Sequence, residues 1–223
     1  MVNLRPLSLL EARVLGVLIE KAHTVPDSYP LSLNALTLGC NQKTAREPVL
    51  SADEAQVRMA ADALKALNLV FESSGSRVVR YEHNLGRVLS LPSQSVALLA
   101  ALMLRGPQTV SELRTNSERL HRFADLSAVQ GFLDELAQRA PDKGGPLVAM
   151  LPRASGAREP RWAHLLSGEP DASSLGADAQ APEFVATSEL VALRLQQAAL
   201  NDEMAQLRAS VERLYAELGI ART

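Results

Sequence analysis

In the first ninety residues, apolar side chains recur every three or four positions along three segments, which predicts three helices. The first helix opens at the capping-box sequence Ser8–Glu11, and a short second helix has Ser32 as its cap. A third helix begins at the capping-box sequence Ser51–Glu54. Two β-prone runs at 69–72 and 77–81 flank a Ser/Gly turn, so a β-hairpin completes this part of the chain.

The same order of elements recurs further along the chain. A helix over 93–105 ends at a Gly-Pro pair, and the capping-box sequence Thr109–Glu112 opens a short second helix. A third helix follows from Leu126, and β-prone runs at 147–151 and 161–165 predict a second hairpin. Because one pattern occurs twice, we interpret it as an internal repeat.

Helix, short helix, helix and hairpin is the element order of a winged helix, which is a variant of the helix-turn-helix. The predicted fold class is therefore mainly α with small β-hairpins, organised as two tandem winged-helix domains at 1–90 and 91–166. The alternative is one undifferentiated helical domain with isolated hairpins.

The stretch Tyr29–Val49 also carries a family resemblance. It reads Tyr-Pro-Leu-Ser-Leu-Asn-Ala-Leu-Thr-Leu-Gly-Cys-Asn-Gln-Lys-Thr-Ala-Arg-Glu-Pro-Val and resembles the signature of the YceH family of bacterial proteins. The resemblance covers roughly residues 5–168. It implies a tandem winged-helix fold but no activity, because the function of that family is not established.

Two further segments follow the repeat. Residues 167–182 are rich in Gly, Pro, Ser and Ala, which predicts a flexible linker. In residues 183–219, apolar side chains repeat every seven positions, as in a coiled coil. The stripe comprises Leu190, Leu193, Gln197, Leu200, Met204, Leu207, Val211, Leu214 and Leu218. We expect it to form a parallel homodimer; the alternative is an amphipathic helix that folds back on the rest of the chain.

The charge of the chain narrows the class of protein. Its 23 Lys and Arg residues face 25 Asp and Glu residues, a formal net charge of -2, which excludes a protein that is basic on every face. The net negative charge lies in residues 169–223, where 9 Asp and Glu residues exceed 4 Lys and Arg residues, so the preceding body is slightly basic. The sequence shows no leader peptide or membrane span, and we therefore expect a cytoplasmic protein that does not bind a membrane.

The sequence shows no set of residues with the spacing of a catalytic or metal site. The histidines His23, His83, His121 and His164 lack the spacing of metal ligands, and the single cysteine, Cys40, has no assignable partner base. Neither a glycine-rich phosphate loop nor a nucleophile elbow occurs. We therefore expect no enzymatic activity, no cofactor and no bound metal.

Cationic and polar side chains near the third helix and the hairpins are candidates for DNA contact, because cations bind phosphate and polar groups read base edges. The candidates are Asn41, Gln42, Lys43, Arg46, Arg58, Lys65, Arg77, Arg80, Arg153, Arg158 and Arg161. In the second repeat the third helix carries Asp134 and Glu135, which suit phosphate poorly, so we expect the first repeat to read DNA. The leading hypothesis is a dimer that binds double-stranded DNA, as a transcription regulator does. The alternative is an interaction scaffold that binds another protein without contacting DNA.

Overall fold

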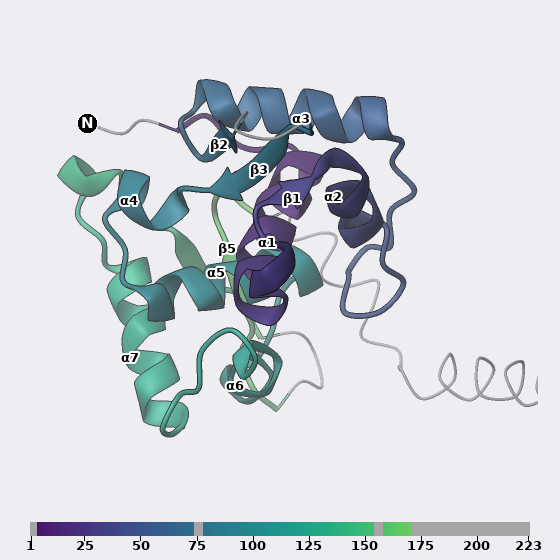
Figure 1. Cartoon of the computed structure of the whole chain (residues 1–223). Helices are drawn as coiled ribbons and strands as arrows, with labels where there is room; N and C mark the ends of the chain where they lie inside the picture. The colour runs from purple at the N-terminus through teal and green to yellow at the C-terminus, as the bar shows by residue number, and fades with distance from the viewer. Residues whose placement is uncertain (1–3, 74–77, 154–157, 171–223) are drawn as a thin grey trace, which may run out of the picture. The chain divides into compact units, whose positions relative to one another are not determined.

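The computed structural model describes residues 4–73, 78–153 and 158–170 (Figure 1). The predicted coiled-coil segment and most of the predicted linker lie outside these residues. The first half contains the elements α1 (Leu9–Thr24), β1 (Leu31–Ser32), α2 (Leu33–Cys40), α3 (Glu54–Ala66), β2 (Val70–Ser73), β3 (Arg80–His83) and α4 (Leu85–Leu89). A 3-10 turn at Pro26–Ser28 links α1 to β1.

The second half repeats much of this order. It contains α5 (Ser93–Arg105), α6 (Val110–Ser117), α7 (Leu126–Ala137), β4 (Val148–Met150) and β5 (Trp162–His164), with a 3-10 turn at Pro141–Lys143. The described chain is thus mainly helical with small antiparallel sheets, as the sequence predicts. In these three ranges no helix is both long and apolar enough to cross a membrane.

The strand pairing follows one scheme in both halves. In the first half an antiparallel sheet has the order β1-β3-β2, and Leu31 of β1 lies opposite Tyr81 of β3. In the second half β4 pairs with β5, and Gln108 forms an antiparallel bridge with Trp162 of β5. Gln108 therefore takes the place in the second half that Leu31 has in the first.

An arginine makes the same contact in each hairpin. A guanidinium N–H of Arg80 donates to the carbonyl of Pro30 at 2.7 Å, and one of Arg161 donates to the carbonyl of Pro107 at 2.8 Å. Each arginine directly precedes the aromatic residue of the last strand, and each proline precedes the residue that faces this aromatic side chain. The contact ties the hairpin to the segment that enters the short helix.

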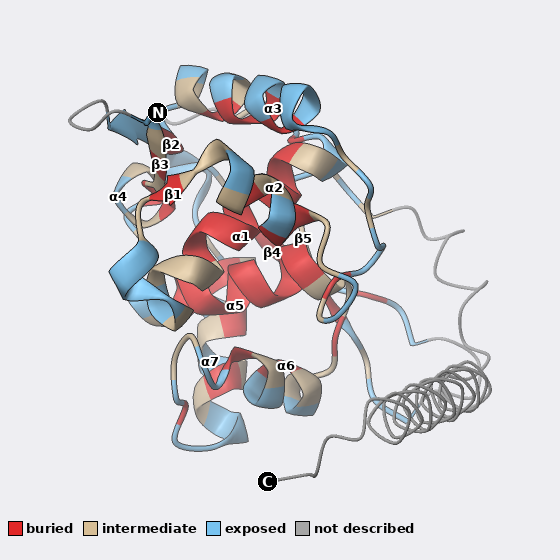
Figure 2. Ribbon diagram, turned by 45° about the vertical axis from the view of Figure 1, so that its right-hand side comes forward, coloured by how far each residue is buried: buried red, intermediate tan, exposed pale blue. Residues whose placement is uncertain are grey.

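Helices α1 and α5 pack against each other at the centre of the core (Figure 2). All side chains of α5 from Ser95 to Leu104 are buried, as expected of a helix enclosed on every side. A Cβ atom at Gly16 would lie 3.0 Å from Cγ of Leu104, so the missing side chain permits this close approach. One cluster of buried residues runs from Leu7 to Leu166, and the two halves share it.

The start of α3 differs from the prediction. Ser51 does not cap this helix; the cap is Asp53, whose side chain accepts from the N–H of Gln56 at 2.8 Å. The side chain of Gln56 accepts in turn from the N–H of Asp53 at 3.0 Å, which completes a capping box. A carboxylate interacts with the positive end of the helix dipole more strongly than a hydroxyl does, which favours Asp53.

Candidate interaction surface

The loop between α2 and α3 is held from within by the buried guanidinium of Arg46. Its Nη2 donates to Oε2 of Glu20 on α1 at 2.6 Å, and its Nε donates to the carbonyl of Gly39 at 3.1 Å. Burial by itself raises the pKa of Glu20, but the hydrogen bond and charge of Arg46 outweigh it, and the pKa is lowered. The side chain of Arg46 has no exposed surface, so it is packed inside the loop and is not presented to solvent.

Two other DNA-contact candidates also shape this loop. Asn41 pairs with the backbone of Ala52, donating to its carbonyl at 2.7 Å and accepting from its N–H at 2.9 Å. Oε1 of Gln42 accepts a hydrogen bond from Arg46 at 2.6 Å. Lys43, by contrast, is exposed. The loop candidates therefore divide into those that hold the loop and a single exposed cation.

The outer face of α3 carries balanced rather than positive charge. Arg58 is exposed, whereas Lys65 donates to Asp62 at 3.3 Å and also to Glu72 of β2. These contacts, the one with Glu72 above all, raise the pKa of Lys65. Because two carboxylates already neutralise Lys65, this lysine offers little attraction to a phosphate group.

A hollow of about 370 Å³ lies between α3, the start of α2 and the first hairpin. Its apolar lining consists of Leu33, Val78, Val79 and Tyr81. Its charged lining is Arg58, Asp62 and Glu72, so carboxylates outnumber cations. Among these residues only Arg58 is a predicted DNA-contact candidate, because the hollow exists only once the hairpin packs beside α3. We call this hollow, with its lining, the α3 groove.

The arginines of the hairpins differ in their availability. Arg80 and Arg161 hold backbone carbonyls, and Arg161 also pairs with Glu112 at 3.1 Å. Arg153 and Arg158 are exposed, and among the described residues neither has a hydrogen-bonding or ionic partner. Arg77 lies outside the described residues. The structure therefore does not gather the DNA-contact candidates into one basic surface.

Large apolar side chains are exposed on α2 and α3, two elements that line the α3 groove, and in the loop between them. The exposed fraction is 66% for Leu38 on α2, 54% for Val49 in the following loop and 72% for Met59 on α3. Single exposed apolar residues are ordinary on protein surfaces. These three side chains lie on α2, in the following loop and on α3, so exposed apolar residues recur along this part of the chain.

Two histidines that were not predicted as site residues occupy equivalent positions in the two halves. His83 and His164 end the last strand of their halves, and each stands two residues after an aromatic residue that follows an arginine. The Nδ1 atom of each is buried without a hydrogen-bond partner, and burial lowers both pKa values to about 4. The repeated Arg-aromatic-X-His sequence was the signal that could have revealed them.

The structure also locates the groups that a catalytic site would need. Cys40 is buried at the end of α2, and burial raises the pKa of its thiol to about 12, so the reactive thiolate is scarce at neutral pH. Across the described part of the chain, no three His, Cys, Asp or Glu side chains lie together as metal ligands would.

Known proteins resemble this chain over nearly its whole length. Residues 7–157 match a family model described as a protein of unknown function, DUF480. A UPF0502 protein of Burkholderia multivorans is 62% identical over 218 residues, which cover 97% of this chain and 91% of that protein. A UPF0502 protein of Leptothrix cholodnii is 59% identical over 219 residues, or 97% of each chain. One of Cupriavidus necator is 60% identical over 220 residues, or 97% of this chain and 89% of that one.

Proposed function

The chain belongs to the DUF480 family of proteins of unknown function, and we propose that it is a non-enzymatic tandem winged-helix protein of the cytoplasm that binds another protein. The proposed binding face is the α3 groove together with the exposed apolar side chains of α2 and α3. The resemblance to the YceH family covers roughly residues 5–168 and is most specific in residues 29–49; it implies the same tandem winged-helix fold.

Strand order supports the winged-helix part of this proposal. A short strand before α2 joins the hairpin that follows α3, which gives the order β1-β3-β2. In the second half Gln108 makes the corresponding pairing before α6. This arrangement leaves one side of α3 exposed along its length, beside the hairpin (Figure 2). An exposed third helix beside a hairpin is the surface that winged helices use for binding.

The lining of the α3 groove is the observation that carries the protein-binding part. When a winged helix binds DNA, the helix enters the major groove and the hairpin follows the backbone, so phosphates lie near the space between them. Here that space presents Asp62 and Glu72 against Arg58. Lys65 pairs with both carboxylates, so the charges at the groove balance and offer no net attraction to phosphate. Apolar walls with balanced charge match the surface of a protein partner.

Site-specific crosslinking in cells tests this proposal. A photoreactive benzophenone side chain replaces Val79 in the α3 groove; the matched control replaces Met150, which is 58% exposed on the second hairpin. We expect a protein adduct from position 79 and none from position 150. Adding Val78→Glu to the same chain is expected to reduce the adduct several-fold, because a charge then enters the apolar wall. Equal adducts at both positions, or no adduct at position 79, contradict the proposal.

DNA binding is the second candidate function, and the exposed side chains of Arg153 and Arg158 favour it. Titration with mixed duplex DNA across a salt series decides between the two. The protein-binding proposal expects no salt-sensitive binding. If duplex DNA binds at low salt, and Arg153→Ala with Arg158→Ala makes the salt dependence shallower by about one or two counterions, DNA is the partner and the proposal is wrong.

A further inference from the structure

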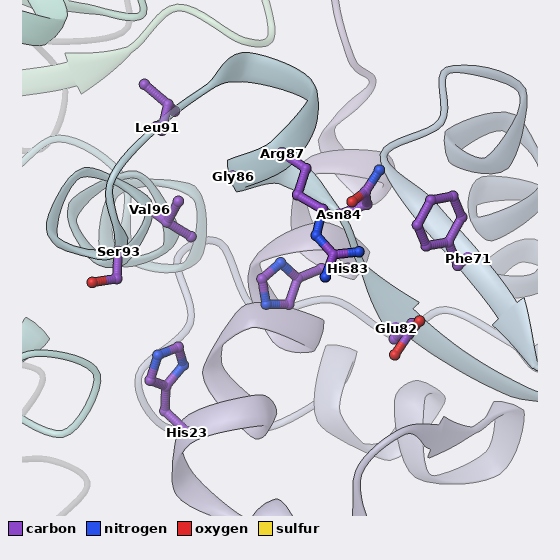
Figure 3. A pocket seen from close by; sticks show the side chains of 10 residues that line it. All are labelled: His23, Phe71, Glu82, His83, Asn84, Gly86, Arg87, Leu91, Ser93 and Val96. Carbon is purple, nitrogen blue, oxygen red and sulfur yellow. The ribbon is translucent and has the colours of Figure 1, made fainter.

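A second pocket, of about 440 Å³, lies where the end of α1, the first hairpin, α4 and the start of α5 meet (Figure 3). Its volume falls within the range of sites that hold small molecules. It shares no lining residue with the α3 groove. A ligand in this pocket therefore leaves the proposed protein-binding face uncovered.

Basic side chains from three elements line this pocket. They are His23 from the last turn of α1, His83 from the end of β3 and Arg87 from α4, and Figure 3 shows all three around the same space. Burial chiefly, and the charge of His23 in addition, lowers the pKa of His83 to about 4, so His83 is neutral at pH 7. The permanent positive charge of the pocket is that of Arg87. Its side chain is exposed and makes no ion pair with another described residue.

The first turn of α5 adds hydrogen-bond donors. Its N-cap is Pro92, which has no side-chain acceptor, so the first N–H groups of the helix are left without a cap. Every other described α-helix of eight or more residues has a side-chain oxygen as its cap. Ser93, the first residue of α5, lines the pocket, so the positive end of the helix dipole lies at its wall.

We propose that this pocket binds a small organic anion, whose carboxylate or phosphate group contacts Arg87 and the uncapped start of α5. Leu91, Val96 and Phe71 line the same pocket and supply apolar surface for the body of such a ligand. Glu82 is the one acidic side chain among the lining residues. It opposes an anion, and its replacement therefore provides a test of opposite sign to that of Arg87.

Titration of the full chain with benzoate, followed by backbone and imidazole NMR signals, tests the proposal. Benzamide serves as the neutral molecule of the same shape. We expect benzoate to shift the amide signals of Ser93 and Gln94 and the ring signals of His83, and to bind about tenfold more tightly than benzamide. Phenyl phosphate, as a second probe, is expected to shift the same signals.

Three substitutions test which side chains contribute to benzoate binding. Arg87→Gln is expected to weaken benzoate binding about tenfold, since a charge-assisted hydrogen bond is lost. Glu82→Gln is expected to tighten it, and Arg58→Gln on α3 to leave it unchanged. Because Arg87 is exposed, its variant is expected to fold, and the thermal midpoint checks this. Equal binding of benzoate and benzamide, an unchanged affinity in Arg87→Gln, or no binding of either anionic probe overturns the proposal.

Discussion

At the scale of single residues, His83 and His164 give the fold a sensitivity to acid. Both have pKa values of about 4 in the folded chain, against 6.5 for an ordinary histidine, chiefly because of burial. Between these values the unfolded chain binds protons that the folded chain does not. The stability is therefore complete above about pH 6.5 and decreases as the pH falls towards 4.

We predict that lowering the pH from about 7 to about 5 reduces the free energy of unfolding by on the order of 2 kcal/mol for each of these histidines. Urea denaturation at the two pH values measures the loss. Glu11 and Glu20, whose pKa values are lowered, lose their contribution only below about pH 4.5, so this window isolates the histidines. In the variant with His83→Gln and His164→Gln, the difference between the two pH values should nearly vanish; an unchanged difference contradicts the assignment.

The role of an arginine could not be read from the sequence. Arg46, Arg58 and Arg80 look alike along the chain, yet Arg46 binds Glu20, Arg80 binds the carbonyl of Pro30, and Arg58 is exposed. The partners are 26 and 50 residues away in sequence, so only the tertiary fold brings them together. A count of cations near the third helix therefore overestimates the charge that is available to DNA.

At the scale of elements, periodicity and capping signals located most helices, because both act within a few residues. The caps at Ser8, Ser32 and Thr109 are as predicted. The short helix α4 was not predicted, since its five residues are too few to show a period. The first hairpin pairs Val70–Ser73 with Arg80–His83, a little later than its β-prone runs, because pairing between the strands sets the register.

The contact between α1 and α5 leads to a prediction on two glycines. Gly16→Val is expected to destabilise the fold by about 1–3 kcal/mol, since the new side chain meets Leu104 in a packed core. The control is Gly131→Ala in α7, where a Cβ atom meets nothing within 4 Å; it should stabilise the fold by about 1 kcal/mol, because alanine favours the helix. Denaturant midpoints compare the variants, and a neutral effect of Gly16→Val would falsify the tight packing.

At the scale of the whole molecule, the order of the main helices and hairpins was predictable from the sequence, whereas the surfaces that elements form together were not. The α3 groove needs the hairpin beside α3, and the anion pocket needs α1, the hairpin, α4 and α5 in one place. Such sites have no local sequence pattern. The stripe in residues 183–219, in contrast, repeats every seven positions and is a local sequence pattern. Self-association is therefore a proposal that rests on the sequence alone.

We predict that Leu200→Asp with Leu207→Asp converts a dimer into a folded monomer, because both leucines occupy the proposed seam. Light scattering measures the mass, and circular dichroism checks that the fold persists. Arg213→Ala, at a heptad position that faces away from the seam, serves as the control and should leave the dimer intact. A mass that is the same in all variants is evidence against the seam.

The shared core has a consequence for synthesis on the ribosome. Helix α1 ends at Thr24, whereas its main packing partner α5 begins only at Ser93. At roughly 5–20 residues per second, the nascent chain needs several seconds to supply α5 after α1 has emerged. During this interval the side of α1 that α5 later covers stays open to water, so the first half completes its folding only when translation has moved well into the second.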